Sequence, residues 1–237
     1  TAICHALFEP FDAVKTVGNM KPETRAASYN GMTDEEIIAS WKKKGLEAST
    51  TGTKVHAAIE VFLNTGFITR DPSIRAHINM FINFYKGEFL RTMCLEPVRT
   101  ELLVFGPKQN ATMAGSIDLL ARSRKTGEFY IGDWKCVGGD LSVSYGKTCN
   151  VPWLRQFRIP DSKLGVYSLQ LHLYRYVLMH SHNFPFIPVA NLFLVVLHPD
   201  NAGYKVLPCL DLSACIPIMF DHMDDIIAIN NERKEKH

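Results

Sequence analysis

The sequence lacks the features that define several classes of protein. Its six cysteines occur singly, with no C-x-x-C pair and no Cys/His spacing typical of a zinc ribbon. No apolar run approaches the roughly 20 residues of a membrane helix, and the longest, residues 190–197, has the length of a buried strand. The formal net charge is only +2, which excludes a histone-like polycation. Any contact with nucleic acid must therefore come from a local patch.

No signal or transit peptide is visible, and the cysteines form no secreted disulfide framework. We therefore predict an intracellular protein without a membrane partner; a nuclear, mitochondrial or viral-factory location is not distinguished. At 237 residues, 46% hydrophobic and 21% charged, one globular domain is the default. We predict a single domain over 1–237, mostly helical in 1–95, with the sheet and its flanking helices in 96–237.

Hydrophobic periodicity predicts an α/β (α+β) fold with a mixed central sheet flanked by helices. Residues 1–30 are predicted to form a short helix and an irregular segment. Thr33 is the predicted N-cap of a helix that ends at Gly45, and Asp71 is the cap of a later one. Further helices are expected at 50–64, 164–181 and 213–231, and strands at 98–105, 112–122, 128–135, 190–197 and 203–207.

Three charged residues are predicted to share one face of the hairpin formed by 112–122 and 128–135. A turn centred between residues 125 and 126 pairs Asp118 with Asp133. Lys135 points to the same face because side-chain direction alternates along a strand. Facing carboxylates repel by roughly 0.2–1 kcal/mol, and a divalent cation turns this repulsion into coordination. Two acids and a lysine around a metal are the minimum equipment for hydrolysing a phosphodiester.

Two helices carry further polar pairs at i,i+4 spacing. His56 and Glu60 lie on one face of the helix at 50–64, and Gln170 and Tyr174 lie on one face of the helix at 164–181. Glu60 is also compatible with simple pairing to a lysine. Four other histidines show no partner pattern and are predicted to be structural: His172, His180, His182 and His198.

In this order, the motifs G-T-x-x-H-x-x-I-E, A-G-S-I-D, D-W-K and L-Q-L-x-x-Y resemble the RecB-type branch of the PD-(D/E)XK nuclease superfamily. They span residues 52–174. Relatives include CRISPR adaptation nucleases, the mitochondrial genome maintenance exonuclease, phage lambda exonuclease and nucleases of large DNA viruses. Phe11-Asp12 and the stretch from Tyr29 to Trp41 resemble the viral members. The resemblance implies a restriction-endonuclease-like core, with Ile117 standing where the superfamily name has proline.

The resemblance implies a role for each matched position. Asp118 and Asp133 would bind the metal, with the Trp134 carbonyl as a further ligand. Lys135 would orient or help deprotonate the attacking water and steady the charge on the scissile phosphate. His56 would supplement the metal site, which tilts the preference from Mg²⁺ toward Mn²⁺.

Further positions follow from the same resemblance. Gln170 and Tyr174 match the helix motif that hydrogen-bonds near the site and positions nucleic acid. Glu101 is a further candidate metal ligand, although pairing across 106–110 predicts it opposite Gly115 and facing away from Asp118 unless a bulge intervenes. Because the four-cysteine cluster of several relatives is absent, we predict no iron–sulfur cluster and Mg²⁺ or Mn²⁺ as the cofactor.

The long connection 136–162 and the residue that follows it interleave aromatic and basic side chains. Such a segment suits stacking on unpaired bases and neutralisation of phosphates, although an ordinary surface loop remains the alternative. Tyr145 and Phe157 are among its aromatics. The predicted nucleic-acid-binding residues are Lys147, Trp153, Arg155, Arg158 and Lys163.

Together these patterns predict a metal-dependent DNA nuclease. We expect an exonuclease or end-processing enzyme that prefers single-stranded DNA and acts in replication, repair or recombination, with a larger replication or repair assembly as a further partner. Two alternatives stay open. One is an RNA-cleaving endonuclease of the cap-snatching type, and the other is a nucleic-acid-binding module with an inactive site.

Overall fold

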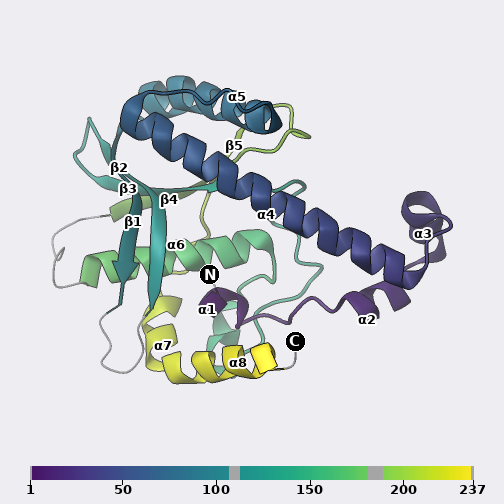
Figure 1. Ribbon diagram of the computed structural model, residues 1–237. Helices are drawn as coiled ribbons and strands as arrows, with labels where there is room; N and C mark the ends of the chain where they lie inside the picture. Colours follow the sequence, from purple (N-terminus) through teal and green to yellow (C-terminus); the bar gives the residue numbers. More distant parts are fainter. Residues whose placement is uncertain (1, 107–112, 181–188, 236–237) are drawn as a thin grey trace.

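The computed structural model describes residues 2–106, 113–180 and 189–235. Its centre is a five-stranded sheet in the order β1-β2-β3-β4-β5, with helices on both faces (Figure 1). β3 and β4 run parallel, and the other neighbouring strands are antiparallel. This confirms the predicted mixed sheet flanked by helices. The strands are β1 (Leu95–Phe105), β2 (Ala114–Ser123), β3 (Phe129–Lys135), β4 (Val189–Val196) and β5 (Lys205–Pro208).

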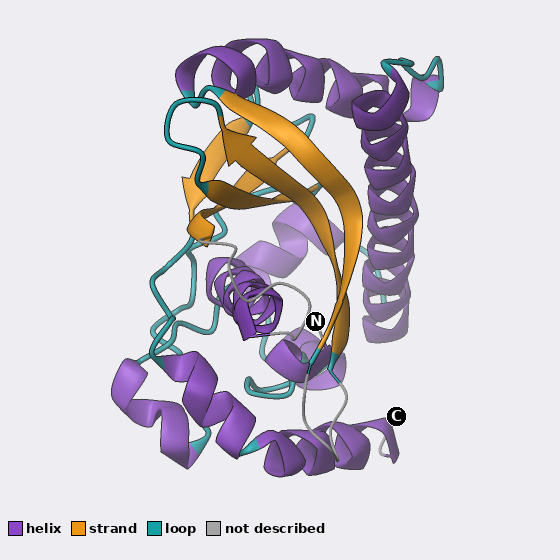
Figure 2. Cartoon of the chain, turned by 90° about the vertical axis from the view of Figure 1, so that its left-hand side faces the viewer, coloured by secondary structure: helices purple, strands orange, loops and turns teal. Residues whose placement is uncertain are grey.

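A separate apolar cluster covers each face of the sheet. On one face, α4 (Asp34–Thr65) and α5 (Arg75–Asn83) pack over a cluster that includes Trp134. On the other face, α6 (Lys163–His180) packs over a cluster that includes Ile131. Figure 1 shows α4 and α5 above the strands and α6 below them, and Figure 2 shows the twisted strands from the side between these layers. The central strand β3 is therefore covered on both faces.

α4 is one continuous helix of 32 residues, so the prediction of two separate helices was wrong. Its start was predicted correctly: Thr33 and Glu36 form a reciprocal capping box. The helix continues through Gly45 and Gly52, because an interior glycine costs only about 1 kcal/mol relative to alanine and no proline interrupts the segment. It ends at Gly66, whose φ of 78° is the left-handed conformation of a helix C-cap.

The N-terminal segment is more helical than predicted. Asp12 caps α2 (Ala13–Gly18) by accepting a hydrogen bond from a backbone N–H, and α3 (Pro22–Tyr29) begins with a proline at its first position. Figure 1 shows both helices beside the end of α4 that lies away from the sheet. Trp41 Nε1 donates a hydrogen bond of 2.8 Å to the Tyr29 hydroxyl, which fixes α3 to α4.

Several other boundaries differ from the prediction. The helix predicted from Asp71 forms as three consecutive helical segments of different type: 3-10, α and π. The C-terminal helix is interrupted at His222. The predicted edge strand at 203–207 is β5, at the margin of the sheet. No helix in the described ranges combines the length and apolar character needed to cross a bilayer. The remaining helices are α1 (Ala2–His5), η1 (Pro72–Ile74), the π-helix η2 (Phe84–Thr92), η3 (Pro152–Phe157), α7 (Cys215–Asp221) and α8 (Met223–Glu235).

Candidate active site

The β2–β3 hairpin has the register predicted from its turn. Leu119 pairs with Gly132 in the last pair of this ladder, and Asp118 and Asp133 occupy the next position of each strand. Both carboxyl side chains are buried, with Asp118 9% and Asp133 2% exposed. Two facing carboxylates are thus held inside the sheet, where water does little to screen their repulsion.

Three metal-ligating side chains converge beside this hairpin. One donor atom from each of His56 on α4, Glu101 on β1 and Asp118 on β2 lies within 4.8 Å of the other two. Nδ1 of His56 is 3.3 Å from Oδ2 of Asp118. That oxygen also accepts a hydrogen bond of 2.9 Å from the Trp134 amide, which fixes the carboxylate against β3. An imidazole and two carboxylates form a donor set that suits Mn²⁺ or Mg²⁺.

Glu101 reaches this group because the register of β1 differs from the prediction. Gly115 pairs with Val104, and the same register places Glu101 opposite Asp118. The predicted pairing of Glu101 with Gly115 was wrong by three residues, because the strands stay hydrogen-bonded as far as Gly106 and Met113. Residues 107–110 of the predicted turn lie outside the described ranges. Glu101 has a φ of 46°, and its carboxylate accepts a hydrogen bond of 2.7 Å from Ser116 Oγ.

The hydrogen bonds of His56 determine which ring nitrogen faces the acids. Nε2 lies 2.9 Å from the Trp134 carbonyl oxygen, which only accepts, so Nε2 carries the proton of the neutral ring. Burial lowers the pKa of His56 and favours this neutral form. Nδ1 then presents a lone pair to Asp118. The Trp134 carbonyl, which was predicted to be a metal ligand, accepts the hydrogen bond from Nε2 and orients the imidazole.

The surroundings of Asp118 disfavour its ionised form. Burial raises the pKa of Asp118 well above its usual value, and the neighbouring Asp133 and Glu101 raise it further. A divalent cation between the carboxylates would remove this penalty, since it stabilises the ionised form. Asp133 is not one of the three converging donors. Glu60, one turn beyond His56, is not one of them either.

Lys135 pairs with the second aspartate of the hairpin. Its Nζ is 2.7 Å from Asp133 Oδ2, an ion pair in which that oxygen nevertheless makes no hydrogen bond of good geometry. Burial acts to lower the pKa of Lys135, but Asp133 outweighs it and the pKa is raised. Nζ also lies 4.3 Å from the centre of the Tyr167 ring, within the range of a cation–π contact. Lys135 is therefore an ammonium ion held in place from two sides.

Sequence reasoning missed Tyr167. The signal was present, because Tyr167, Gln170 and Tyr174 follow the i, i+3, i+7 spacing of one helical face. The structure joins the other two directly: Gln170 Nε2 donates a hydrogen bond of 3.0 Å to the Tyr174 hydroxyl. Tyr174 packs so closely on Gly115 of β2 that a Cβ there would lie 2.3 Å from its ring. Only glycine at this position lets the Gln170–Tyr174 pair approach the strand that carries Asp118.

The structure separates the predicted nucleic-acid-binding residues into two groups. Lys147 is 3.7 Å from Glu9 in an ion pair, and Trp153 stacks on His222 with ring centres 4.5 Å apart, so both already have protein partners. The other three are exposed and form no ion pair within the described ranges: Arg155, Arg158 and Lys163. Tyr145, in the same connection, is 92% exposed.

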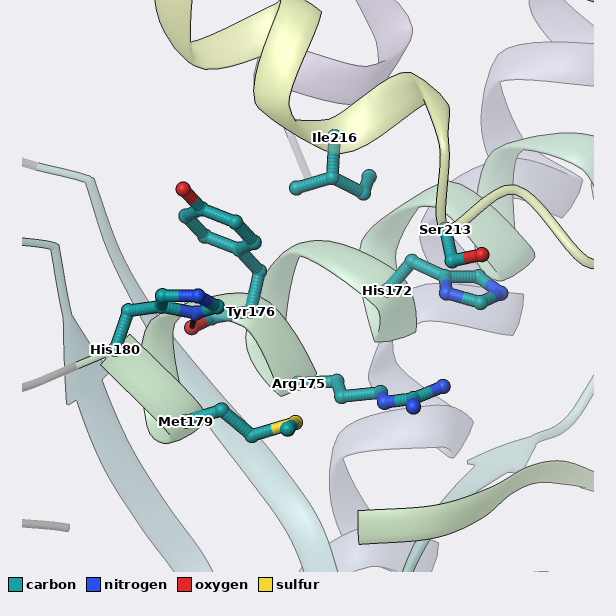
Figure 3. Close-up of a pocket in the computed structure, with 7 residues that line it drawn as sticks. All are labelled: His172, Arg175, Tyr176, Met179, His180, Ser213 and Ile216. Atoms are coloured by element: carbon teal, nitrogen blue, oxygen red, sulfur yellow. Dashed lines mark hydrogen bonds between the residues drawn. The ribbon is translucent and has the colours of Figure 1, made fainter. Parts of the chain in front are cut away.

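A different pocket lies between α6 and the start of α7 (Figure 3). Its lining includes His172 and His180 but none of the residues predicted for the site. His172 Nε2 lies 2.9 Å from the Leu210 carbonyl oxygen, in agreement with its predicted structural role. His182 lies outside the described ranges. This pocket is therefore separate from the candidate active site.

Comparisons with known proteins add little to this geometry. No protein-family model matches the sequence, and no curated protein matches it. Among solved structures, the chain is similar to a proposed exonuclease from Eubacterium rectale, with a TM-score of 0.47 and 13% sequence identity over 77% of this chain and 68% of that one. A similarity of this size assigns no function, so the functional argument depends on the residues of the site.

Proposed function

We propose that this protein is a metal-dependent nuclease of the RecB-type PD-(D/E)XK superfamily that hydrolyses phosphodiester bonds of DNA. One observation carries the proposal. His56 turns the lone pair of Nδ1 toward the buried carboxylate of Asp118, 3.3 Å away, with Glu101 beside both. Atoms that present lone pairs to one another need a proton or a cation between them. The position is bordered by the hairpin that carries Lys135.

The residues present fit a divalent cation such as Mn²⁺ or Mg²⁺. His56, Glu101 and Asp118 would hold it, and the motif resemblance adds Asp133 as a further ligand. The imidazole favours Mn²⁺ over Mg²⁺. A bound cation supplies Lewis acidity at a phosphoryl oxygen and lowers the pKa of a water molecule.

The protein's own groups would position the substrate and balance its charge. Because its pKa is raised, Lys135 keeps its proton at neutral pH and donates hydrogen bonds. It thus stabilises negative charge that develops on the scissile phosphate, in preference to acting as a base. Asp133 and Tyr167 hold the ammonium in place, and the Trp134 carbonyl holds the proton of His56 at Nε2.

We propose single-stranded DNA, entered from an end, as the substrate. The exposed guanidinium groups of Arg155 and Arg158 and the ammonium of Lys163 carry no protein counter-ion in the described ranges and are free to pair with phosphates. Tyr145 exposes an aromatic ring that is suited to stack on an unpaired base. Replication, repair or recombination is the corresponding cellular setting.

Cleavage of end-labelled linear and circular single-stranded DNA tests this function. We expect products from the linear strand with Mn²⁺ or Mg²⁺ and none in EDTA, with the circle resistant. Cutting of the circular strand would show an endonuclease and not an exonuclease. Cutting of RNA alone would favour the cap-snatching alternative, and binding without cleavage of either nucleic acid would overturn the nuclease.

The exposed arginines give a second prediction. Arg155→Ala/Arg158→Ala is expected to weaken binding of single-stranded DNA in EDTA by about tenfold at low salt. Each lost phosphate contact should also reduce the slope of log K against log[salt] by about 0.7. Fluorescence anisotropy at several salt concentrations measures both. The matched control is Arg122→Ala, another exposed arginine, in β2; an equal loss there would mean that general charge, not this segment, binds the strand.

A further inference from the structure

A pocket of about 270 Å³ lies between α4 and the ends of the two central strands. Cys136 follows Lys135 directly at the end of β3, and His198 follows β4. On α4, Thr51 lies five residues before His56, about 7.5 Å along the helix axis. The pocket therefore lies one residue from Lys135 along the chain and about a turn and a half of α4 before His56. Its lining residues are Lys44, Glu47, Ala48, Thr51, His77, Cys136, His198 and Pro199.

One polar group that lines this pocket is buried without a partner. His77 is only 7% exposed, and its Nδ1 is buried without a hydrogen bond. Lys44 and Thr51 form no side-chain hydrogen bond or ion pair within the described ranges. A buried polar group without a partner costs about 1–3 kcal/mol, so the His77 Nδ1 indicates a missing ligand. The exposed Lys44 and the half-buried Thr51 are free to bind the same ligand.

These groups specify the charge of that ligand. The ammonium of Lys44 and the hydroxyl of Thr51 donate hydrogen bonds. Burial and the neighbouring His198 lower the pKa of His77, so the ring is neutral, and in its Nδ1–H tautomer it would donate to the ligand as well. Glu47 is the one acid among the lining residues, and its side chain is exposed at the surface of α4. A group of donors with one cation favours an anion with several acceptor oxygens.

We infer that this pocket binds a phosphate of the nucleic-acid backbone, adjacent to the phosphate held at His56, Asp118 and Lys135. The inference rests on the proposed function for its location and deepens it, since the enzyme would grip the strand on one side of the bond it cleaves. A phosphodiester presents two non-bridging oxygens, which match donors that come from opposite walls of the pocket. The contact would read charge and spacing of the backbone and not the bases.

The test measures binding without metal, so that it does not depend on cleavage. A labelled single-stranded oligonucleotide is prepared with each phosphate replaced in turn by an uncharged methylphosphonate, and its affinity is measured in EDTA by fluorescence anisotropy. For the unmodified protein, we expect one position at which the replacement weakens binding about tenfold. Lys44→Ala/Thr51→Val should lose the same factor on the all-phosphate strand and become insensitive to the replacement at that position.

The matched control is Lys42→Ala/Thr53→Val, which removes the same groups from other parts of the α4 surface. It should keep the position-specific sensitivity of the unmodified protein. The inference would be overturned if the affinity losses from the protein substitutions and from the methylphosphonate simply added. It would also be overturned if the control behaved like the Lys44→Ala/Thr51→Val protein. Thermal melting checks that the variants fold; if one does not, the ring nitrogens of His77 in the unmodified protein decide the question by NMR. They should shift with the all-phosphate strand and stay unchanged with the methylphosphonate one.

The outcome is separable from that of the nuclease itself. If the substitutions and one methylphosphonate position were coupled but no DNA were cleaved, the phosphate pocket would be supported in a protein that only binds nucleic acid. If DNA were cleaved but no such coupling were found, the nuclease would be supported and the phosphate pocket excluded.

Discussion

Replacing Lys135 by alanine is expected to lower the rate of metal-dependent cleavage by about 10²–10⁴-fold, the range for loss of a charged group that stabilises a transition state. The ammonium is 2.7 Å from Asp133, is held over the Tyr167 ring and keeps its proton. Its charge is therefore positioned before the substrate arrives. The rate constant of cleavage under single-turnover conditions measures the effect, because it does not depend on product release.

Two further variants show whether the loss is due to the charge of Lys135. Lys125→Ala removes an exposed lysine from the turn of the same hairpin and should leave the rate unchanged. Lys135→Arg keeps the charge but changes its shape, so we expect it to recover part of the rate. If Lys135→Ala cleaved as fast as the unmodified protein, the catalytic assignment of the hairpin would be wrong. A loss confined to substrate affinity would instead make Lys135 a binding residue.

The part of the site that could be predicted from the sequence depends on local rules. The β2–β3 turn is short, so its centre fixed the register that places Asp118 opposite Asp133. The capping box at Thr33 was equally local, because both of its hydrogen bonds join residues three apart. The i,i+4 spacing likewise placed Gln170 beside Tyr174. Each of these rests on residues that are neighbours along the chain or across one turn.

Contacts that depend on longer connections could not be predicted in the same way. The register of β1 was three residues wrong, because the length of the connection to β2 is not marked by any single turn signal. That error placed Glu101 on the wrong side, although it lies beside Asp118. Tyr167 was missed because its partner Lys135 lies on another element, 32 residues earlier in the chain. The packing of α6 on the sheet decides which helical face meets the site.

Asp118→Asn is expected to have opposite effects on activity and on stability. The amide keeps an oxygen that accepts from the Trp134 amide, but it removes a charge that is buried beside Asp133 and Glu101. Without metal at neutral pH, we expect the variant to melt about 3–6 °C higher than the unmodified protein, since each kcal/mol raises Tm by about 2–4 °C at this size. Cleavage should fall by more than about 10³-fold, because the converging donors lose a charge.

The pH dependence of this gain has a definite sign. The pKa of Asp118 is raised in the folded state, so the folded protein binds more protons than the unfolded chain. The penalty of the charge is therefore present at neutral pH and disappears as pH falls below the unfolded value of about 3.9. We expect the difference in Tm between Asp118→Asn and the unmodified protein to narrow as pH falls from neutral toward about 3.9. Asp221→Asn, which removes an exposed carboxylate, should show neither the gain nor its loss.

Metal should reverse the order of stability. A cation that binds only the folded state stabilises it by about 2.7 kcal/mol at 100 times its Kd. We expect Mn²⁺ to raise the Tm of the unmodified protein by several degrees and to leave Asp118→Asn almost unchanged. A buried carboxylate kept only for structure would respond differently, because its replacement would lower the metal-free Tm and leave any response to Mn²⁺ intact. With the proposed function, the buried charge of Asp118 would thus lower stability without metal and be neutralised when a cation binds.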